Sequence, residues 1–277
     1  MAGVNVTGQI NFMFMVFINT LCASGGIFMS QYSGASDTDG MQQAFRFKII
    51  LCGTSGIIYM ILSCSAPPAL LELMVHGNTQ SEEIVNQALI YMRSVAFSWV
   101  PMVFSQSIAS SLRETGIVKP PLLISVSAAL VNTFFNWVFI YGNLGSPRLE
   151  VAGVGIATNI ARLFELFVFL LYAEKTRPQF LFKIGTVLCI KLRLFGTILS
   201  KSAMILVSEM TWSVSETIVT ALYNTRGSAD VVSGMAAGFA IANLFFVCFS
   251  GIFTSTGVII GKLLGAGQLD QARTQKT

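Results

Sequence analysis

Two carboxylates lie on one face of a long apolar stretch of the sequence. Glu209 and Glu216 are seven residues apart, which in a helix is two turns, or about 10 Å. Polar or aromatic residues on or beside the same face are Ser202, Ser213 and Trp212. Residues 202–222 contain no Lys or Arg that could neutralise the pair. The sequence therefore predicts a helix with an uncompensated acidic stripe.

A carboxylate in a low-dielectric site tends to take up a proton or bind a cation unless a basic group meets it. Either event changes the local charge, which the coupling of an ion to transport requires. We therefore expect Glu209 to bind the coupling cation, Na⁺ or H⁺, with Glu216 as a second carboxylate. The alternative is a hydrogen bond to another helix. No other metal and no cofactor is expected, because the five Cys are scattered and His76 is the single His.

Polar side chains also occur inside two other apolar stretches. Asn132 and Asn136 are four residues apart, so one helix face carries both amides. They could offer carbonyl oxygens to a small cation or bond to a neighbouring helix, which is the more common use of such residues. Thr158 is a weaker candidate of the same kind. We expect these three residues, with Trp212 and Ser213, to line the polar part of a cavity.

Arg162 and Glu165 bring opposite charges into one apolar stretch. A charge in mid-membrane costs on the order of 3 kcal/mol. The spacing of three residues lets the two side chains meet on one helix face, so we interpret them as a structural ion pair. Arg93 is expected to pair with a carbonyl or carboxylate near the outer interface.

Composition places these residues in a membrane. Of 277 residues, 53% are hydrophobic and 11% are charged, whereas soluble domains carry about 25% charged residues. Apolar runs of about 20 residues mark membrane-spanning helices. We predict an all-α, polytopic membrane protein with seven transmembrane helices: residues 9–32, 47–66, 87–110, 119–142, 152–173, 197–222 and 236–261. Pro101 removes a backbone hydrogen bond and predicts a bend in the third span.

The basic residues fall in alternate loops. Thirteen Lys and Arg, Arg46 and Lys48 among them, belong to the loops on one side of the predicted spans, and two belong to the other side. The positive-inside rule makes the first set cytoplasmic. This places residue 1 outside and residue 277 inside a cytoplasmic membrane. It also accounts for the net charge of +4 without a nucleic-acid partner.

One apolar stretch occurs twice. Gly3–Ala35 aligns with Gly234–Ala266 at a shift of 231 positions, without a gap and with eight identical residues. The copies are six spans apart, so they share an orientation, as in transporters built from parallel repeats. Because a helix precedes the second copy, we expect one helix before residue 1 and four after residue 277, in two lobes of six. The expected parts are an N-terminal lobe without its first helix (1–178), a cytoplasmic connector (179–196) and the first two helices of a C-terminal lobe (197–277).

Five segments, in order, resemble the multidrug and toxic compound extrusion family. The first three are similar to its basic turn, its Asn-containing helix and the Gly-rich entry to its sixth helix: SLRETGIVKPP (111–121), VNTFFNWVFIYG (131–142) and VAGVGIATNIARLFE (151–165). The other two are similar to its seventh and eighth helices: SEMTWSVSETIVTALYNTRG (208–227) and GVIIGKLLGAGQLDQAR (257–273). The chain would then correspond to helices two to eight of twelve.

The resemblance implies an antiporter and not an enzyme. In this family two six-helix lobes hold small amphipathic organic cations between them, and entry of Na⁺ or H⁺ drives their export. It also implies a cation-linked carboxylate at the position of Glu209. Some members carry Asn then Asp on the fifth helix, where this chain has Asn132 and Asn136, which weakens a cation site there. The implied partners are the lipid bilayer and the organic cations, and the implied transporter is monomeric.

Three other interpretations stay open. A lipid-linked oligosaccharide flippase of the same superfamily would show basic residues lining its cavity, and Arg93 and Arg162 are candidates for that role. A seven-span receptor or intramembrane enzyme fits the span count, but the sequence has no HExxH or GxSxG motif. A truncated chain would transport nothing, because alternating access needs both lobes.

Overall fold

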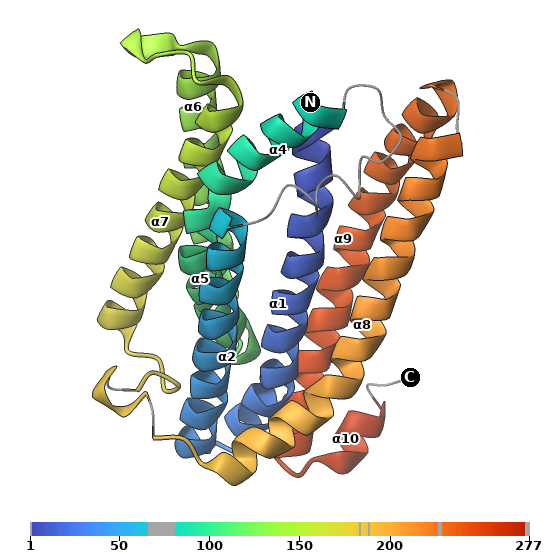
Figure 1. The fold of residues 1–277 in the computed structure, drawn as a ribbon. Coiled ribbons are helices and arrows are strands. Elements are labelled where there is room, and N and C mark those ends of the chain that lie inside the picture. Colours follow the sequence, from blue (N-terminus) through green and yellow to red (C-terminus); the bar gives the residue numbers. More distant parts are fainter. Residues whose placement is uncertain (1, 66–80, 183, 188, 227–228, 275–277) are drawn as a thin grey trace.

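The structure is a computed structural model that describes residues 2–65, 81–182, 184–187, 189–226 and 229–274. All regular structure in these residues is helical (Figure 1). The helices are α1 (Ala2–Gly34), α2 (Thr38–Ser65), α4 (Ser81–Val95), α5 (Trp99–Glu114), α6 (Lys119–Tyr141), α7 (Glu150–Thr176), α8 (Leu192–Arg226), α9 (Ala229–Gly265) and α10 (Leu269–Thr274). Short 3-10 turns lie at Ala96–Ser98, Asn143–Gly145 and Ile184–Thr186.

The predicted spans correspond to these helices. Six of them are long and apolar enough to cross a membrane: Ile10–Gly34, Thr38–Ser65, Val85–Glu114, Lys119–Tyr141, Glu150–Thr176 and Phe245–Gly265. The remaining predicted span, 197–222, lies within α8, which has 35 residues. Its described part is more polar because it carries the acidic stripe. The prediction of an all-α, polytopic membrane protein is confirmed.

Local sequence explains where the helices begin and end. The amide of Gly40 donates to Asp37 Oδ1 at 3.0 Å, which caps the first turn of α2. Two prolines in the first turn start α6, and Gly142, in the left-handed region at φ 71°, ends it. The third span breaks at the 3-10 turn Ala96–Ser98. The ring of Pro101 conflicts with the carbonyl four residues earlier, that of Phe97, so the predicted bend is confirmed.

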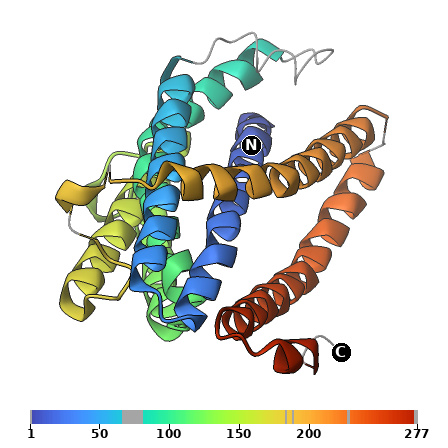
Figure 2. The ribbon, with the colours of Figure 1, turned by 90° about the horizontal axis from the view of Figure 1, so that it is seen from below.

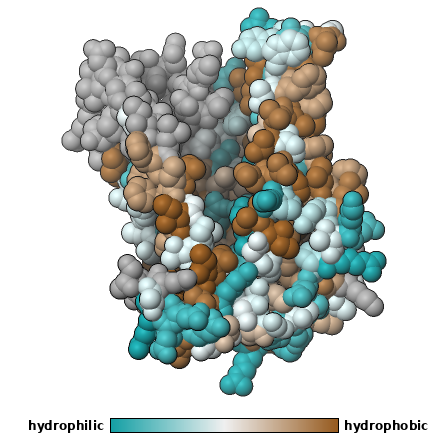
Figure 3. All heavy atoms as spheres, turned by 180° about the vertical axis from the view of Figure 1, so that it is seen from behind, coloured by the Kyte–Doolittle hydropathy of each residue, from teal (hydrophilic) through white to brown (hydrophobic). Residues whose placement is uncertain are grey.

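Helix α1 lies at the centre of the molecule. It packs against α2, α4, α5, α8 and α9 (Figure 1). On one side α7 packs against α4 and α5, and α6 packs against α7. The beginning of α1 and the end of α9 lie at opposite ends of the bundle. Seen from behind, hydrophobic surface covers much of the upper and middle part and hydrophilic residues gather at the lower end (Figure 3).

The two copies of the repeat touch each other through glycines. A Cβ atom on Gly34 would lie 2.0 Å from the carbonyl oxygen of Lys262. A Cβ atom on Gly265 would lie 1.9 Å from the carbonyl oxygen of Gln31. The shift of 231 carries the first contact into the second, so the crossing has local two-fold symmetry, as an isologous contact requires. At its centre a Cβ on Gly261 would lie 2.7 Å from Cβ of Ser30, the residue equivalent to it.

Away from this crossing the two helices separate. Figures 1 and 2 both show α1 and α9 close together at their C-terminal ends and apart toward the beginning of α1. Both run in the same direction along the bundle, which is the geometry that a parallel repeat predicts. The two helices therefore form a V whose closed end is the glycine crossing, and the space between their diverging parts is called the gap.

We predict that a bulky residue at the crossing separates α1 from α9. In a Ser30→Cys, Gly261→Cys background the two thiols should form a disulfide, because a shift of about 1 Å takes their Cβ atoms from 2.7 Å to the separation of about 3.8 Å that the bond needs. Adding Gly265→Leu should slow this cross-linking by about tenfold or more, since the side chain collides with the carbonyl of Gln31. Rates are measured by mobility shift after mild oxidation.

The matched control is Gly257→Leu, two turns earlier on α9, where a Cβ would meet nothing within 4 Å. It should leave the cross-linking rate unchanged. Equal rates in the Gly265→Leu and Gly257→Leu backgrounds would show that the glycine contact does not hold the helices together.

Candidate functional site

The acidic stripe of α8 is partly open. Glu209 is exposed, Glu216 is partly buried, and Trp212 is 48% exposed. Ser213 is buried, and its hydroxyl has no hydrogen-bond partner among the described atoms. The ion pairs found in the described residues involve neither carboxylate. Glu209 and Glu216 thus have no basic partner in this part of the chain, as the sequence predicts.

The two asparagines of α6 bond to each other. Nδ2 of Asn136 donates to Oδ1 of Asn132 at 2.9 Å. Oδ1 of Asn136 is buried and, among the described atoms, has no donor. Thr158 on α7 is satisfied within its own helix, because its hydroxyl donates to the Val154 carbonyl at 2.8 Å. The pair therefore keeps one free carbonyl oxygen, which is the atom a small cation or a substrate donor would use.

Arg162 and Glu165 make the contact that their spacing predicts. Nη1 of Arg162 lies 2.8 Å from Oε2 of Glu165 on the same helix. The hydroxyl of Ser125 on α6 donates to the other carboxylate oxygen at 2.9 Å. Both oxygens of a buried carboxylate are thus bonded, which ties α7 to α6. Arg93 is exposed in the last turn of α4 and meets no carboxylate in the described residues.

The predicted residues fall into two groups. One group is on α6 and α7, and the other is on α8, which packs against α1, α2 and α9. Figure 1 shows α1 between the two groups. The structure therefore joins Asn132 to Asn136 and Arg162 to Glu165, and it places the carboxylates of α8 on the other side of α1.

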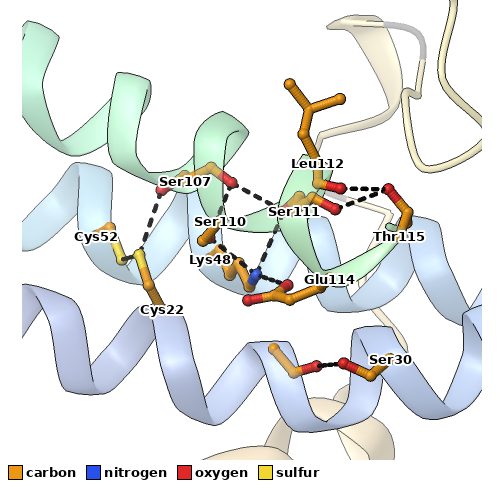
Figure 4. A network of polar contacts seen from close by, with 11 residues as sticks. Cys22, Ser30, Lys48, Cys52, Ser107, Ser110, Ser111, Leu112, Glu114 and Thr115 are labelled. Carbon is orange, nitrogen blue, oxygen red and sulfur yellow. Dashed lines mark hydrogen bonds and ion pairs between the residues drawn. The ribbon is translucent and has the colours of Figure 1, made fainter. Parts of the chain in front are cut away.

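A buried ion pair that the sequence did not reveal lies between α2 and α5. Lys48 is 0% exposed and pairs with Glu114 (Figure 4). Its ammonium also donates to the hydroxyls of Ser110, at 3.0 Å, and Ser111, at 3.3 Å. The prediction that Lys48 is a loop charge is therefore wrong. Helix α2 already begins at Thr38, so Lys48 is well inside it.

Glycines of α1 make room for this pair. A Cβ on Gly25 would lie 2.8 Å from Cγ of Lys48, and one on Gly26 would lie 2.1 Å from Oε1 of Glu114. Beside them the thiols of Cys22 and Cys52 lie 3.6 Å apart. The Lys48 ammonium has three donors and meets three acceptors, so its hydrogen-bonding capacity is filled. The pair is buried between α1, α2 and α5, and we therefore interpret it as structural.

Sequence signals for the pair existed. The count of loop charges includes Lys48 although the predicted span 47–66 contains it, and a charge inside a span needs a partner. Its partner, Glu114, follows Ser110 and Ser111 near the end of the third apolar stretch. The adjacent glycines Gly25 and Gly26 occur in the first apolar stretch. These segments belong to three different helices, so no spacing along one helix could connect them.

The chain between α7 and α8 is held beneath α2. Gln43 Nε2 and Arg46 Nη1 both donate to the carbonyl of Cys189, at 3.1 and 3.2 Å. The other arm of Arg46 donates to the hydroxyl of Thr186 at 3.1 Å. Lys191 pairs with Asp39, whose carboxylate raises the pKa of the lysine. The expected connector is therefore attached to α2, and Arg46 is engaged by it.

We predict that losing one member of the Lys48–Glu114 pair destabilises the protein more than losing both. Glu114→Leu or Lys48→Met alone leaves an uncompensated buried charge and should lower the free energy of unfolding by about 3–5 kcal/mol. The double variant should recover a large part of that loss. Thermal unfolding in detergent checks this.

Glu174→Leu, on the exposed end of α7, serves as the control and should have little effect. The prediction is contradicted if the two single losses simply add in the double variant.

Comparisons with known proteins agree with this geometry. The MatE family model matches residues 1–138 and 204–276. A probable multidrug resistance protein NorM of Halalkalibacterium halodurans is 26% identical over 246 residues, which cover 88% of this chain and 53% of that protein. The multidrug resistance protein MdtK of Pectobacterium atrosepticum is 24% identical, again over 88% of this chain and 53% of that protein. The chain thus spans about half the length of these curated relatives.

Solved structures show the same fold. A multidrug resistance MATE family transporter of the MOP superfamily in an outward-facing conformation has a TM-score of 0.80 at 20% identity, covering 99% of this chain and 59% of that one. A MATE structure in the straight conformation has a TM-score of 0.81 at 19% identity with the same coverage. The family model covers most of the chain and includes three of the five motifs described above in full. The chain therefore belongs to the MatE family.

Proposed function

We propose that the protein carrying this chain exports amphipathic organic cations in exchange for Na⁺ or H⁺. The observation that carries the proposal is Glu209, an exposed carboxylate on α8 without a basic partner in the described residues. Family membership supports a transporter in the cytoplasmic membrane and argues against an enzyme. The relatives named multidrug resistance proteins support drug-like substrates.

The gap between α1 and α9 supports alternating access. With the basic loops in the cytoplasm, the glycine crossing would lie at the cytoplasmic side and the V would open outward. Opening to the cytoplasm would then require the crossing to separate. In this proposal residues 1–178 and 197–277 belong to two lobes that move relative to each other. The connector 179–196, attached to α2, joins them on the cytoplasmic side.

Charge neutralisation links the ion to this movement. A cation or proton on Glu209 would remove a net charge from the surface of α8, which would change the relative stability of open and closed lobes. Glu216, about two turns away, offers a second carboxylate. Trp212 supplies apolar contact area to an organic cation, and cation–π attraction adds to it. The free oxygen of Asn136, with Asn132 and Thr158, gives a polar wall on the other side of α1.

The flippase alternative receives less support from the side chains. Such a protein needs unpaired basic groups for lipid phosphates. Arg162 is engaged by Glu165 on its own helix, which leaves Arg93 as the exposed candidate of the two. We therefore keep organic-cation export as the proposal.

We predict that Glu209→Gln abolishes ion-driven export. The amide keeps the shape of the side chain but cannot be protonated or carry charge, so an imposed Na⁺ or pH gradient should drive ethidium efflux at least about tenfold more slowly than in the wild type. The measurement is ethidium fluorescence in proteoliposomes under each gradient separately, which also distinguishes the two ions.

Glu174→Gln, the same change at the exposed end of α7, is the matched control and should export at the wild-type rate. Gradient-driven efflux that persists in Glu209→Gln would exclude this carboxylate from coupling.

A further inference from the structure

A second polar group lies between α1 and α5, away from the residues discussed so far. Nε2 of Gln106 donates to Oδ1 of Asn19 at 2.8 Å. Asn19 is exposed and Gln106 is partly buried. An amide has both a donor and an acceptor, so a single bond between two amides leaves one of each free. That holds whichever way the two groups are oriented.

Asn19 lies too deep inside its candidate membrane span to belong to a solvated loop. Asn19 lies nine residues after the start and 15 residues before the end of the candidate span Ile10–Gly34. These separations correspond to about 13 and 22 Å along the helix axis. An unsatisfied amide in hydrocarbon costs several kcal/mol. Polar side chains at such depth face the protein interior or a water-filled cavity.

The direction of Asn19 follows from the glycine crossing. The exposed residues in the middle of α1 are Phe12, Asn19, Ala23 and Ile27. At 100° per residue, all four fall within an arc of about 80° that also contains Ser30 and Gly34. Those last two residues touch α9. The exposed stripe of α1 is thus the continuation of its contact face, and it points into the gap where the two helices diverge (Figure 2).

The opposite wall of the gap follows from the local symmetry. The shift of 231 carries Asn19 to Ser250 and Ala23 to Thr254, both exposed on α9. The hydroxyl of Thr254 donates to the carbonyl of Ser250 at 2.8 Å. Hydrophobic residues adjoin the amides on α1, since Phe12 is 43% and Ile27 47% exposed. The gap therefore holds a small neutral polar spot on a largely apolar wall.

We propose that Asn19 and Gln106 form a hydrogen-bonding subsite for substrates of the transporter. The subsite would take a neutral carbonyl, amide or hydroxyl group of an amphipathic molecule, pairing it with the free donor and acceptor. This inference rests on the proposed export function and adds a specificity to it. Cations without hydrogen-bonding groups would pass the same gap without using the pair, because they can interact only with the apolar wall and the carboxylates of α8.

The test compares two substrates in one set of variants. Norfloxacin carries a keto group next to a carboxyl group, whereas tetraphenylphosphonium has no hydrogen-bonding group. In Asn19→Leu and Gln106→Leu, norfloxacin efflux should fall by about tenfold or more, because a site built to hydrogen-bond loses that partner. Tetraphenylphosphonium efflux should stay within about twofold of the wild type.

Each outcome supports the subsite or overturns it. Equal loss for both compounds would make the pair structural, and an unchanged norfloxacin rate would remove it from recognition. If a leucine variant does not accumulate, Asn19→Ser keeps a small polar side chain and should show the same selective loss. If the wild type exports neither compound, the export proposal fails. Binding to the purified protein then decides, since norfloxacin should bind more weakly to the variants while tetraphenylphosphonium binds equally.

Discussion

The backbone contact between α1 and α9 determines the shape of the molecule. At Gly34 and Gly265 a side chain would take the place of the partner's carbonyl oxygen, so the two helices approach as closely as backbones allow. Helices that touch at one end and are inclined to each other must diverge at the other, which creates the gap in Figures 1 and 2. The exposure of the stripe on α1 depends on that contact. So does the open space beside the exposed residues of α8.

In a low-dielectric surrounding, polar groups that pair with each other can be distinguished from polar groups that are available to a ligand. Lys48 and Glu114 satisfy each other with the help of two hydroxyls, and Arg162 and Glu165 do so with the help of Ser125. Charged groups that pair in this way stabilise the packing of helices. Glu209 and the Asn19–Gln106 pair differ, because they keep unbonded donors or acceptors, and Glu209 and Asn19 are exposed. Spare hydrogen-bonding capacity is therefore the better guide to function here than polarity itself.

Sequence patterns predicted what lies within one helix. Hydrophobic runs predicted the spans, and Pro101 predicted the break in the third span. A spacing of three residues predicted the contact of Arg162 with Glu165. Contacts between helices stayed hidden, because their partners are far apart in the chain: Lys48 and Glu114 are separated by 66 residues and Asn19 and Gln106 by 87. The roles of Glu209 and Glu216 remain predictions, since the geometry shows their exposure and not what they bind.

The repeat explains why residues at the glycine crossing and residues on the exposed stripe are under different steric constraints. Equivalent positions at the crossing must both be small, and Gly34 and Gly265 are identical for that steric reason. Positions on the exposed stripe carry no such demand. The three whose counterparts have described side chains all differ between the copies: Asn19, Ala23 and Ile27 in the first are Ser250, Thr254 and Val258 in the second. A symmetric backbone thus supports a gap whose two walls are chemically unlike, and an asymmetric molecule lying in it can present different groups to each.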